Sequence, residues 1–102
     1  MLHMVVISHN PESCGSHTSL RDQHAAALQR LGEVASTKGL TIQGQWVSPA
    51  AHTAWAVIDA PHAHSVMEAM MESGMMALWS TTIHPVVPMA GASILDALPQ
   101  VP

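Results

Sequence analysis

A chain of 102 residues, 48% of them apolar, is long enough for one globular domain and too short for two. Lys and Arg together number three and the net charge is −4 with neutral histidines, which excludes the basic surface that a nucleic-acid-binding protein needs. The single cysteine cannot form an internal disulfide, no apolar run is long enough to span a membrane, and the first residues lack the features of a signal peptide. We therefore expect a cytoplasmic protein with no nucleic-acid or membrane partner.

Turn-forming residues separate short β-branched runs from longer helical patterns along the chain. The first strand ends at a His-Asn-Pro turn, and the helix that follows has Ser19 as a good N-cap and Gly39 as its stop. Two strands joined by a turn at residues 48–51 come next. A second helix has Pro61 in its first turn, and the last strand contains two prolines, which is typical of a sheet edge. In chain order we predict strand 2–8, helix 19–38, strand 40–48, strand 52–60, helix 61–74 and strand 81–89.

This order, βαββαβ, is that of the ferredoxin-like α+β fold, whose four-stranded antiparallel sheet has the strand order 4-1-3-2 and both helices on one face. In the first strand, Val5 and Ile7 point to one face while Met4 and Val6 point to the other, so both faces are apolar. Charged residues make up only 10% of the chain, against about 25% in typical domains. Because the helices cover one face only, we expect a second copy of the chain to cover the other, which gives a homodimer.

Three segments resemble the dimeric α/β-barrel superfamily: the opening MVVISHNPE, the hairpin GQW…HTAWAVIDAP and the closing IHPVVPM. The nearest likeness is to small, largely uncharacterised bacterial and environmental proteins. The similarity covers most of residues 1–90, which we take as the ferredoxin-like domain, and residues 91–102 are expected to form a C-terminal arm. Relatives on this scaffold include monooxygenases, isomerases, haem-handling proteins and proteins of no known activity, so the resemblance implies a fold and not a reaction.

The predicted topology gathers several potential ligands at one end of the sheet. His9 follows the first strand and His52 begins the third, its antiparallel neighbour, while the fourth strand starts at the same end and would bring His84 closer. The loop with Cys14 and His17 lies over that end. His9, Cys14, His17 and His52 would suit a divalent metal such as zinc, or copper, because both metals bind imidazole and thiolate. Only Cys14 and His17 are closely spaced, so a polar loop that caps the helix, with a partly buried Cys14, stays an alternative.

A histidine is also a suitable general base near neutral pH. We predict that the chain binds or transforms a small molecule, with His9 and His52 as catalytic residues and with Trp46, Trp55 and His84 in the substrate pocket. The chain contains no Gly-rich phosphate loop and no nucleophile elbow, which disfavours nucleotide cofactors and hydrolase chemistry. Two alternatives stay open: a metal-binding dimer, and a structural or regulatory oligomer without chemistry of its own.

Two other groups of residues have a structural interpretation. His24 lies on the apolar face of the first predicted helix, where a core histidine is expected. The helical spacing of Met67, Met70 and Met71 would suit soft copper ligands, but a chain without Phe or Tyr needs methionine to fill its core. We interpret these methionines as packing residues.

Overall fold

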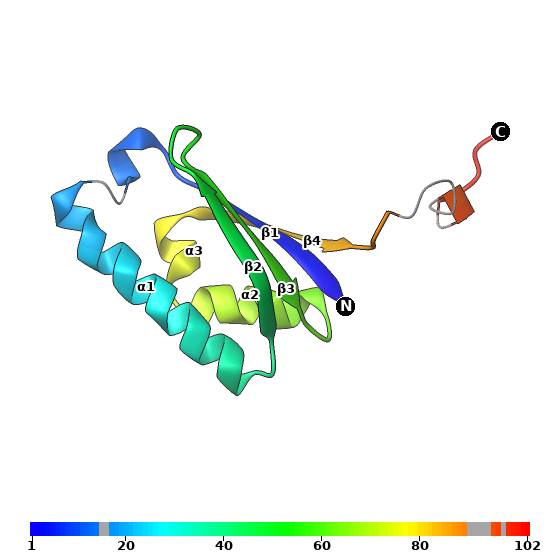
Figure 1. Cartoon of the computed structure of the whole chain (residues 1–102), viewed down its shortest axis with the longest axis horizontal. Coiled ribbons are helices and arrows are strands. Elements are labelled where there is room, and N and C mark those ends of the chain that lie inside the picture. Colours follow the sequence, from blue (N-terminus) through cyan, green and yellow to red (C-terminus); the bar gives the residue numbers. More distant parts are fainter. Residues whose placement is uncertain (15–16, 90–94, 97) are drawn as a thin grey trace.

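The computed structural model describes residues 1–14, 17–89, 95–96 and 98–102 (Figure 1). Its element order confirms the predicted ferredoxin-like α+β fold and adds two short helices, η1 before the first long helix and α3 before the last strand. In chain order the elements are β1 Leu2–Ser8, η1 Pro11–Ser13, α1 Thr18–Thr37, β2 Thr41–Ser48, β3 Thr53–Asp59, α2 Ala63–Glu72, α3 Met75–Leu78 and β4 Ser80–Val86.

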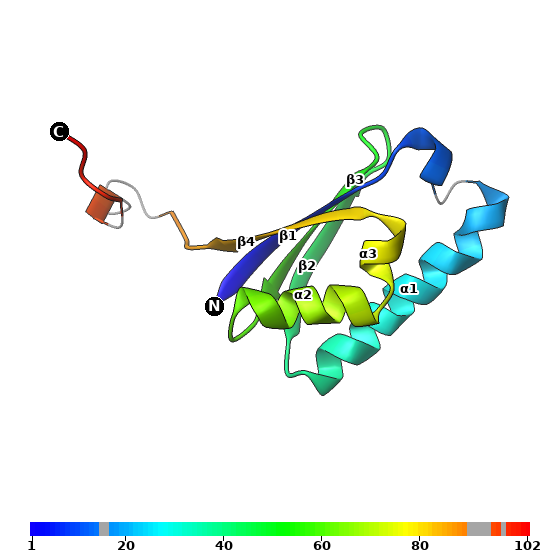
Figure 2. The ribbon, with the colours of Figure 1, turned by 180° about the vertical axis from the view of Figure 1, so that it is seen from behind.

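The four strands form one antiparallel sheet in the order β2-β3-β1-β4, as predicted. Ser8 at the end of β1 is paired with Thr53, the first residue of β3, and with Ser80, the first residue of β4. The end of β1 and the starts of β3 and β4 therefore meet at one end of the sheet. We call this the His9 end, because His9 and His52 flank the paired residues there. Figures 1 and 2 show all three α-helices on the same side of the sheet.

The helix ends follow local backbone chemistry. α1 begins at Thr18, with His17 in extended backbone as its N-cap, so Ser19 lies in the first turn and is not the cap that the sequence suggested. α2 begins at Ala63 and not at Pro61, because the His62 imidazole accepts a hydrogen bond from the Ser65 N–H at 3.2 Å and thereby caps the helix. Gly74 has φ 87°, a left-handed conformation that favours glycine and separates α2 from α3.

The core lies between the helices and one face of the sheet. Val5 and Ile7 of β1 are buried there against residues of all three α-helices. Met70 is fully buried, as the packing interpretation predicts, whereas its neighbour Met71 is 59% exposed. None of the described helices is long and apolar enough to cross a membrane.

The other face of the sheet carries no helix, and we call it the open face (Figures 1 and 2). Directly paired residues point to the same face, so the pairs Val6–Trp55 and Trp55–Trp46 place both tryptophans there. Trp46 is 59% exposed, and its ring covers Gly44, where a Cβ atom would lie only 2.6 Å from the Trp46 Cη2. The paired residues of the open face are Leu2, Met4, Val6, Ser8, Thr41, Gly44, Trp46, Ser48, Thr53, Trp55, Val57, Asp59, Ser80, Thr82, His84 and Val86.

The chain leaves the domain after β4 and extends away from it (Figure 2). The predicted C-terminal arm, residues 91–102, lies partly outside the described residues. Those of its large apolar residues that the structure describes, Leu95, Leu98 and Val101, are all exposed.

Candidate functional site

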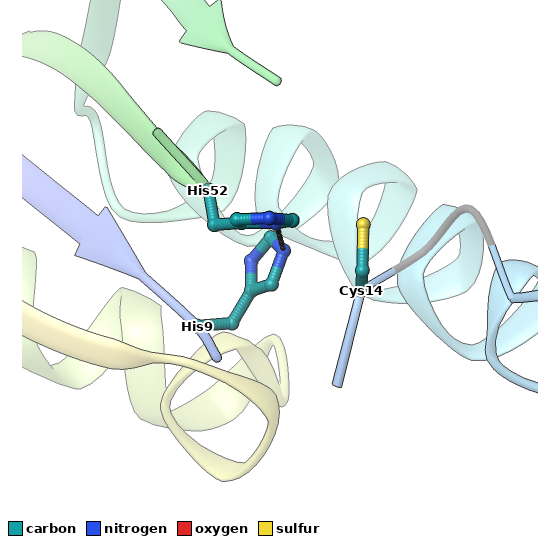
Figure 3. A group of neighbouring side chains, drawn as sticks. All are labelled: His9, Cys14 and His52. Carbon is teal, nitrogen blue, oxygen red and sulfur yellow. Dashed lines mark hydrogen bonds between the residues drawn. The ribbon is translucent and has the colours of Figure 1, made fainter. Parts of the chain in front are cut away.

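β1 and β3 bring His9 and His52 together at the His9 end of the sheet. The His9 backbone N–H donates to the His52 carbonyl at 3.1 Å, which extends the strand pairing by one residue. The two rings meet edge to face with their centroids 5.1 Å apart. His52 Nδ1 and His9 Nε2 lie 3.3 Å apart in a hydrogen bond (Figure 3). One of these nitrogens donates and the other accepts, so each ring fixes the orientation of the other.

The backbone of His52 is in the left-handed region, with φ 50°, and no other non-glycine residue in the described part of the chain has a positive φ. His52 closes the turn between β2 and β3, where its N–H donates to the Pro49 carbonyl at 3.2 Å. Hairpin loops of this kind usually place Gly or Asn at the left-handed position. A side chain with a Cβ costs about 1–2 kcal/mol there. Strain of this kind is concentrated at functional sites, and the His52 ring here bonds to the ring of His9.

Cys14 lies beside this histidine pair (Figure 3). It follows η1, which is capped by Asn10, whose Oδ1 accepts from the Ser13 N–H at 3.0 Å. Cys14 Sγ and one ring nitrogen from each of His9 and His52 all lie within 4.8 Å of one another. In a zinc site, metal–ligand bonds of about 2.0–2.3 Å hold the donor atoms about 3–4 Å apart, so a small side-chain movement would complete a three-ligand site.

His17, the fourth predicted metal ligand, lies outside this group. Its side chain is exposed, and its Nε2 is 3.0 Å from the Pro11 carbonyl. Because His17 is the N-cap residue of α1, its position is set by the start of the helix and not by the histidine pair. The structure therefore brings together three of the four predicted ligands.

A cavity of about 380 Å³ opens beside the pair on the helix-covered face of the sheet. Its size is within the range typical of small-molecule sites, about 300–1,000 Å³. Side chains from both sheet and helices form mostly apolar walls, and His9, Cys14, His24 and His52 supply polar atoms. The main apolar lining residues are Ile7, Leu28, Val47, Ala54, Met75 and Trp79.

Two residues of this cavity, His24 and Trp79, were not predicted as site residues. The His24 ring is 8% exposed and meets the Trp79 ring edge to face with centroids 4.4 Å apart. The His9 ring lies 6.2 Å from His24 and 6.4 Å from Trp79. A usable signal was present for both, because His24 is near the start of α1 and Trp79 directly precedes β4. Both places are at the His9 end.

The environment keeps two of these histidines neutral at pH 7. Burial lowers the pKa of His9, and the nearby His52 and His24 lower it further by charge repulsion. Burial alone lowers the pKa of His24. A neutral imidazole has one donor and one acceptor nitrogen, so these rings can exchange hydrogen bonds or a proton with a ligand.

The structure places the three predicted pocket residues elsewhere. Trp46, Trp55 and His84 all lie on the open face, away from the cavity, and none is among the described residues that line it. β4 does begin at the His9 end, but His84 is four residues further along and pairs with Met4 in the middle of β1. Its Nε2 is 3.1 Å from Thr82 Oγ1 on the same strand.

Comparison with known proteins supports the fold and leaves the activity open. A family model described as a domain of unknown function, DUF3303, matches residues 1–97. No curated protein matches the sequence. Among solved structures, SCO4226 from Streptomyces coelicolor A3(2) is similar with a TM-score of 0.60 and 20% identity, over 86% of this chain and 99% of that chain.

A second similar structure is 5-chloro-2-hydroxyhydroquinone dehydrochlorinase (TftG) from Burkholderia phenoliruptrix AC1100, in complex with 2,5-dihydroxybenzoquinone. It has a TM-score of 0.54 and 17% identity, over 85% of this chain and 94% of that chain. Both likenesses confirm the predicted ferredoxin-like fold. At this level of identity they establish the fold alone.

Proposed function

The chain belongs to the DUF3303 family, and we propose that it binds or transforms a small molecule in the cavity beside His9 and His52. One observation carries this proposal: His52 has a left-handed backbone where a hairpin favours glycine, and its ring is thereby held against His9 at the cavity wall. Folding alone would favour Gly or Asn at this position. We infer that the histidine is kept for what its ring does in the cavity.

The histidine pair would supply the polar contacts of the site. The bond between His52 Nδ1 and His9 Nε2 leaves His52 Nε2 and His9 Nδ1 for a ligand. A neutral imidazole can accept a proton from a hydroxyl group or polarise a carbonyl group, which is the general-base role predicted for these residues. TftG, which shares the fold, was solved with 2,5-dihydroxybenzoquinone. A six-membered ring that carries oxygen atoms is therefore within the capacity of this scaffold.

We further infer that the protein is a homodimer in which the open faces of two copies pack against each other. Met4, Val6, Trp55 and Val57 are partly exposed in the single chain, and Trp46 is 59% exposed. Side chains of this size on one continuous face are typical of a protein interface. The likeness to proteins with the dimeric α/β-barrel fold supports this arrangement.

A second candidate function is metal binding by His9, Cys14 and His52. It is favoured by the grouping of one sulfur and two ring nitrogens within 4.8 Å. A thiolate with two imidazoles suits zinc and leaves one position open for water or substrate. Purification without a tag, followed by metal analysis and thermal melting with and without a chelator, tests this function. Protein that contains no zinc or copper and melts unchanged with added zinc would exclude it.

The small-molecule proposal can be tested by NMR with 4-hydroxybenzamide as the probe. Its ring and hydroxyl group match the apolar wall and the histidine pair. We expect saturable shifts in the backbone signals of His9, His52 and Trp79. We expect His52→Asn to weaken binding at least about tenfold, or 1.4 kcal/mol, because asparagine tolerates the left-handed backbone but lacks the ring.

His84→Asn is the matched control, since it removes an imidazole from the open face. We expect it to leave the affinity unchanged. If His52→Asn binds the probe as the wild type does, or if the shifts map to the open face, the proposed site is incorrect.

A further inference from the structure

The charged side chains of this protein avoid the cavity. The sequence contains three Lys or Arg and seven Asp or Glu, and all ten lie in the part of the chain that the structure describes. None of them lines the cavity beside His9 and His52. The residues that the structure does not describe are all Gly, Ser, Ala or Ile. None of these has a charged side chain, so none could add a charge to the cavity.

The cations that could neutralise an anionic ligand are engaged or placed elsewhere. Lys38 forms ion pairs with Glu72 at 3.0 Å and with Glu68 at 3.3 Å. The Arg30 Nε donates to the Ser73 carbonyl at 3.0 Å, at the end of α2. The third cation, Arg21, is exposed on α1 and does not line the cavity.

A second cavity in the same molecule does have charged residues in its wall. It lies between α1 and α3, is about 440 Å³ in volume and has Asp22 and Arg30 in its wall. The described residues that line the cavity at the His9 end include no Lys, Arg, Asp or Glu. Burial of an ionised group without an opposite charge costs several kcal/mol, so a ligand with a carboxylate or phosphate group would be bound poorly there.

The walls also define the shape of an acceptable ligand. The Trp79 side chain lines the cavity with an aromatic ring, which meets the His24 ring edge to face at a centroid distance of 4.4 Å. Aromatic surfaces of this kind favour flat ring systems. The polar atoms of the histidine pair lie near this surface, since the His9 and Trp79 ring centroids are 6.4 Å apart.

We propose that the cavity selects an uncharged, ring-shaped molecule with a hydroxyl group, and that it discriminates against the carboxylate analogue of the same molecule. This inference rests on the proposed small-molecule function and adds the chemical class of the ligand. Trp79 would contact the ring, and the His9–His52 pair would bond to the hydroxyl group.

The test compares 4-hydroxybenzamide with 4-hydroxybenzoate at neutral pH. The two compounds have the same ring and hydroxyl group and nearly the same size, but only the second is an anion. Binding to the full chain is followed through the Trp79 indole N–H signal, assigned with Trp79→Phe. We expect the amide to bind at least about tenfold more tightly than the carboxylate, a difference of 1.4 kcal/mol.

A cation placed at the cavity rim should weaken this preference. Val47 lines the cavity and is 69% exposed, so Val47→Lys can be accommodated without burial of the ammonium group. We expect Val47→Lys to improve carboxylate binding at least about fivefold relative to the amide. Val47→Gln, which is polar and uncharged, should leave the ratio unchanged.

The results distinguish a failure of the inference about ligand charge from a failure of the proposed small-molecule site. If the wild type binds the carboxylate as tightly as the amide, or if Val47→Lys does not improve carboxylate binding, the inference about charge is overturned and the small-molecule site stands. If neither compound shifts the Trp79 signal or the histidine signals, both the inference and the proposed function are overturned.

Discussion

The two faces of the sheet are both apolar but differ in what covers them. On the helix-covered face, His3, Val5 and Ile7 are buried. On the open face, their neighbours Met4 and Val6 are only partly buried. Strand alternation produces both faces from the same run of residues. Apolar alternation alone therefore does not locate a binding site, because one face forms the core and the cavity while the other carries no helix.

Two histidines on the covered side of the sheet, His3 and His9, also have different surroundings. His3 is fully buried, and neither of its ring nitrogens has a hydrogen-bond partner among the described residues. His9 directly follows the last residue of β1, at the end of the sheet, where its ring bonds to His52 and lines the cavity. We therefore place the chemistry at the end of the covered face and not in its centre.

The largest expected effect comes from a charge in the middle of the open face. Val6 pairs with Trp55 on one side and Thr82 on the other. Val6→Glu should raise the dissociation constant of the dimer about a thousandfold, or about 4 kcal/mol, because it would bury an unpaired carboxylate. Analytical ultracentrifugation measures this constant.

Gln29→Glu, on the exposed surface of α1, adds the same charge away from the sheet and is expected to leave the dimer intact. A wild-type protein that is monomeric in dilute solution would contradict the assignment of the open face to a partner copy.

The covered face can be tested with two adjacent methionines of α2. Met70 is fully buried and Met71 is 59% exposed. Met70→Ala should lower the free energy of unfolding by about 2–5 kcal/mol through the cavity that it leaves. Met71→Ala should change it by no more than about 0.5 kcal/mol. Urea denaturation of both variants checks the pair, and equal effects would show that the helices do not pack as described.

A smaller effect is expected from pH. Burial lowers the pKa of His24 in the folded protein, so the unfolded chain binds the proton first as the pH falls. The contribution of His24 to stability is therefore complete above its unfolded pKa of about 6.5 and is lost as the pH decreases below that value. His9 acts in the same direction.

Thermal melting near neutral pH and in mild acid measures this loss of stability. It should be smaller in His24→Gln than in the wild type. An equal loss in the two proteins would show that His24 titrates as it does in the unfolded chain.

The fold could be predicted from the sequence because its signals are local. The first strand was predicted at residues 2–8, as the structure has it. The meeting of His9 and His52 followed from the topology alone, since the end of β1 must lie beside the start of its antiparallel neighbour β3. Cys14 could be placed near them because η1 keeps the chain close to that end.

The rest of the site depends on details that a sequence pattern does not contain. The face to which Trp46 points is set by the pairing register, which shifts at a bulge between Ile42 and Gly44. His84 is on a strand that starts at the His9 end, but four residues along a strand is about 13 Å, too far for a shared site. The place of Trp79 directly before the last strand indicates the His9 end, but nothing in the sequence indicates the direction of its ring.

We place the ligand site at the His9 end of the covered face. A crystal structure of the protein with 4-hydroxybenzamide will show whether the probe binds there. We predict the ring of the probe against Trp79 and its hydroxyl group in contact with His9 or His52. A probe bound between Trp46 and Trp55 on the open face, with the cavity at the His9 end left without it, would contradict the claim.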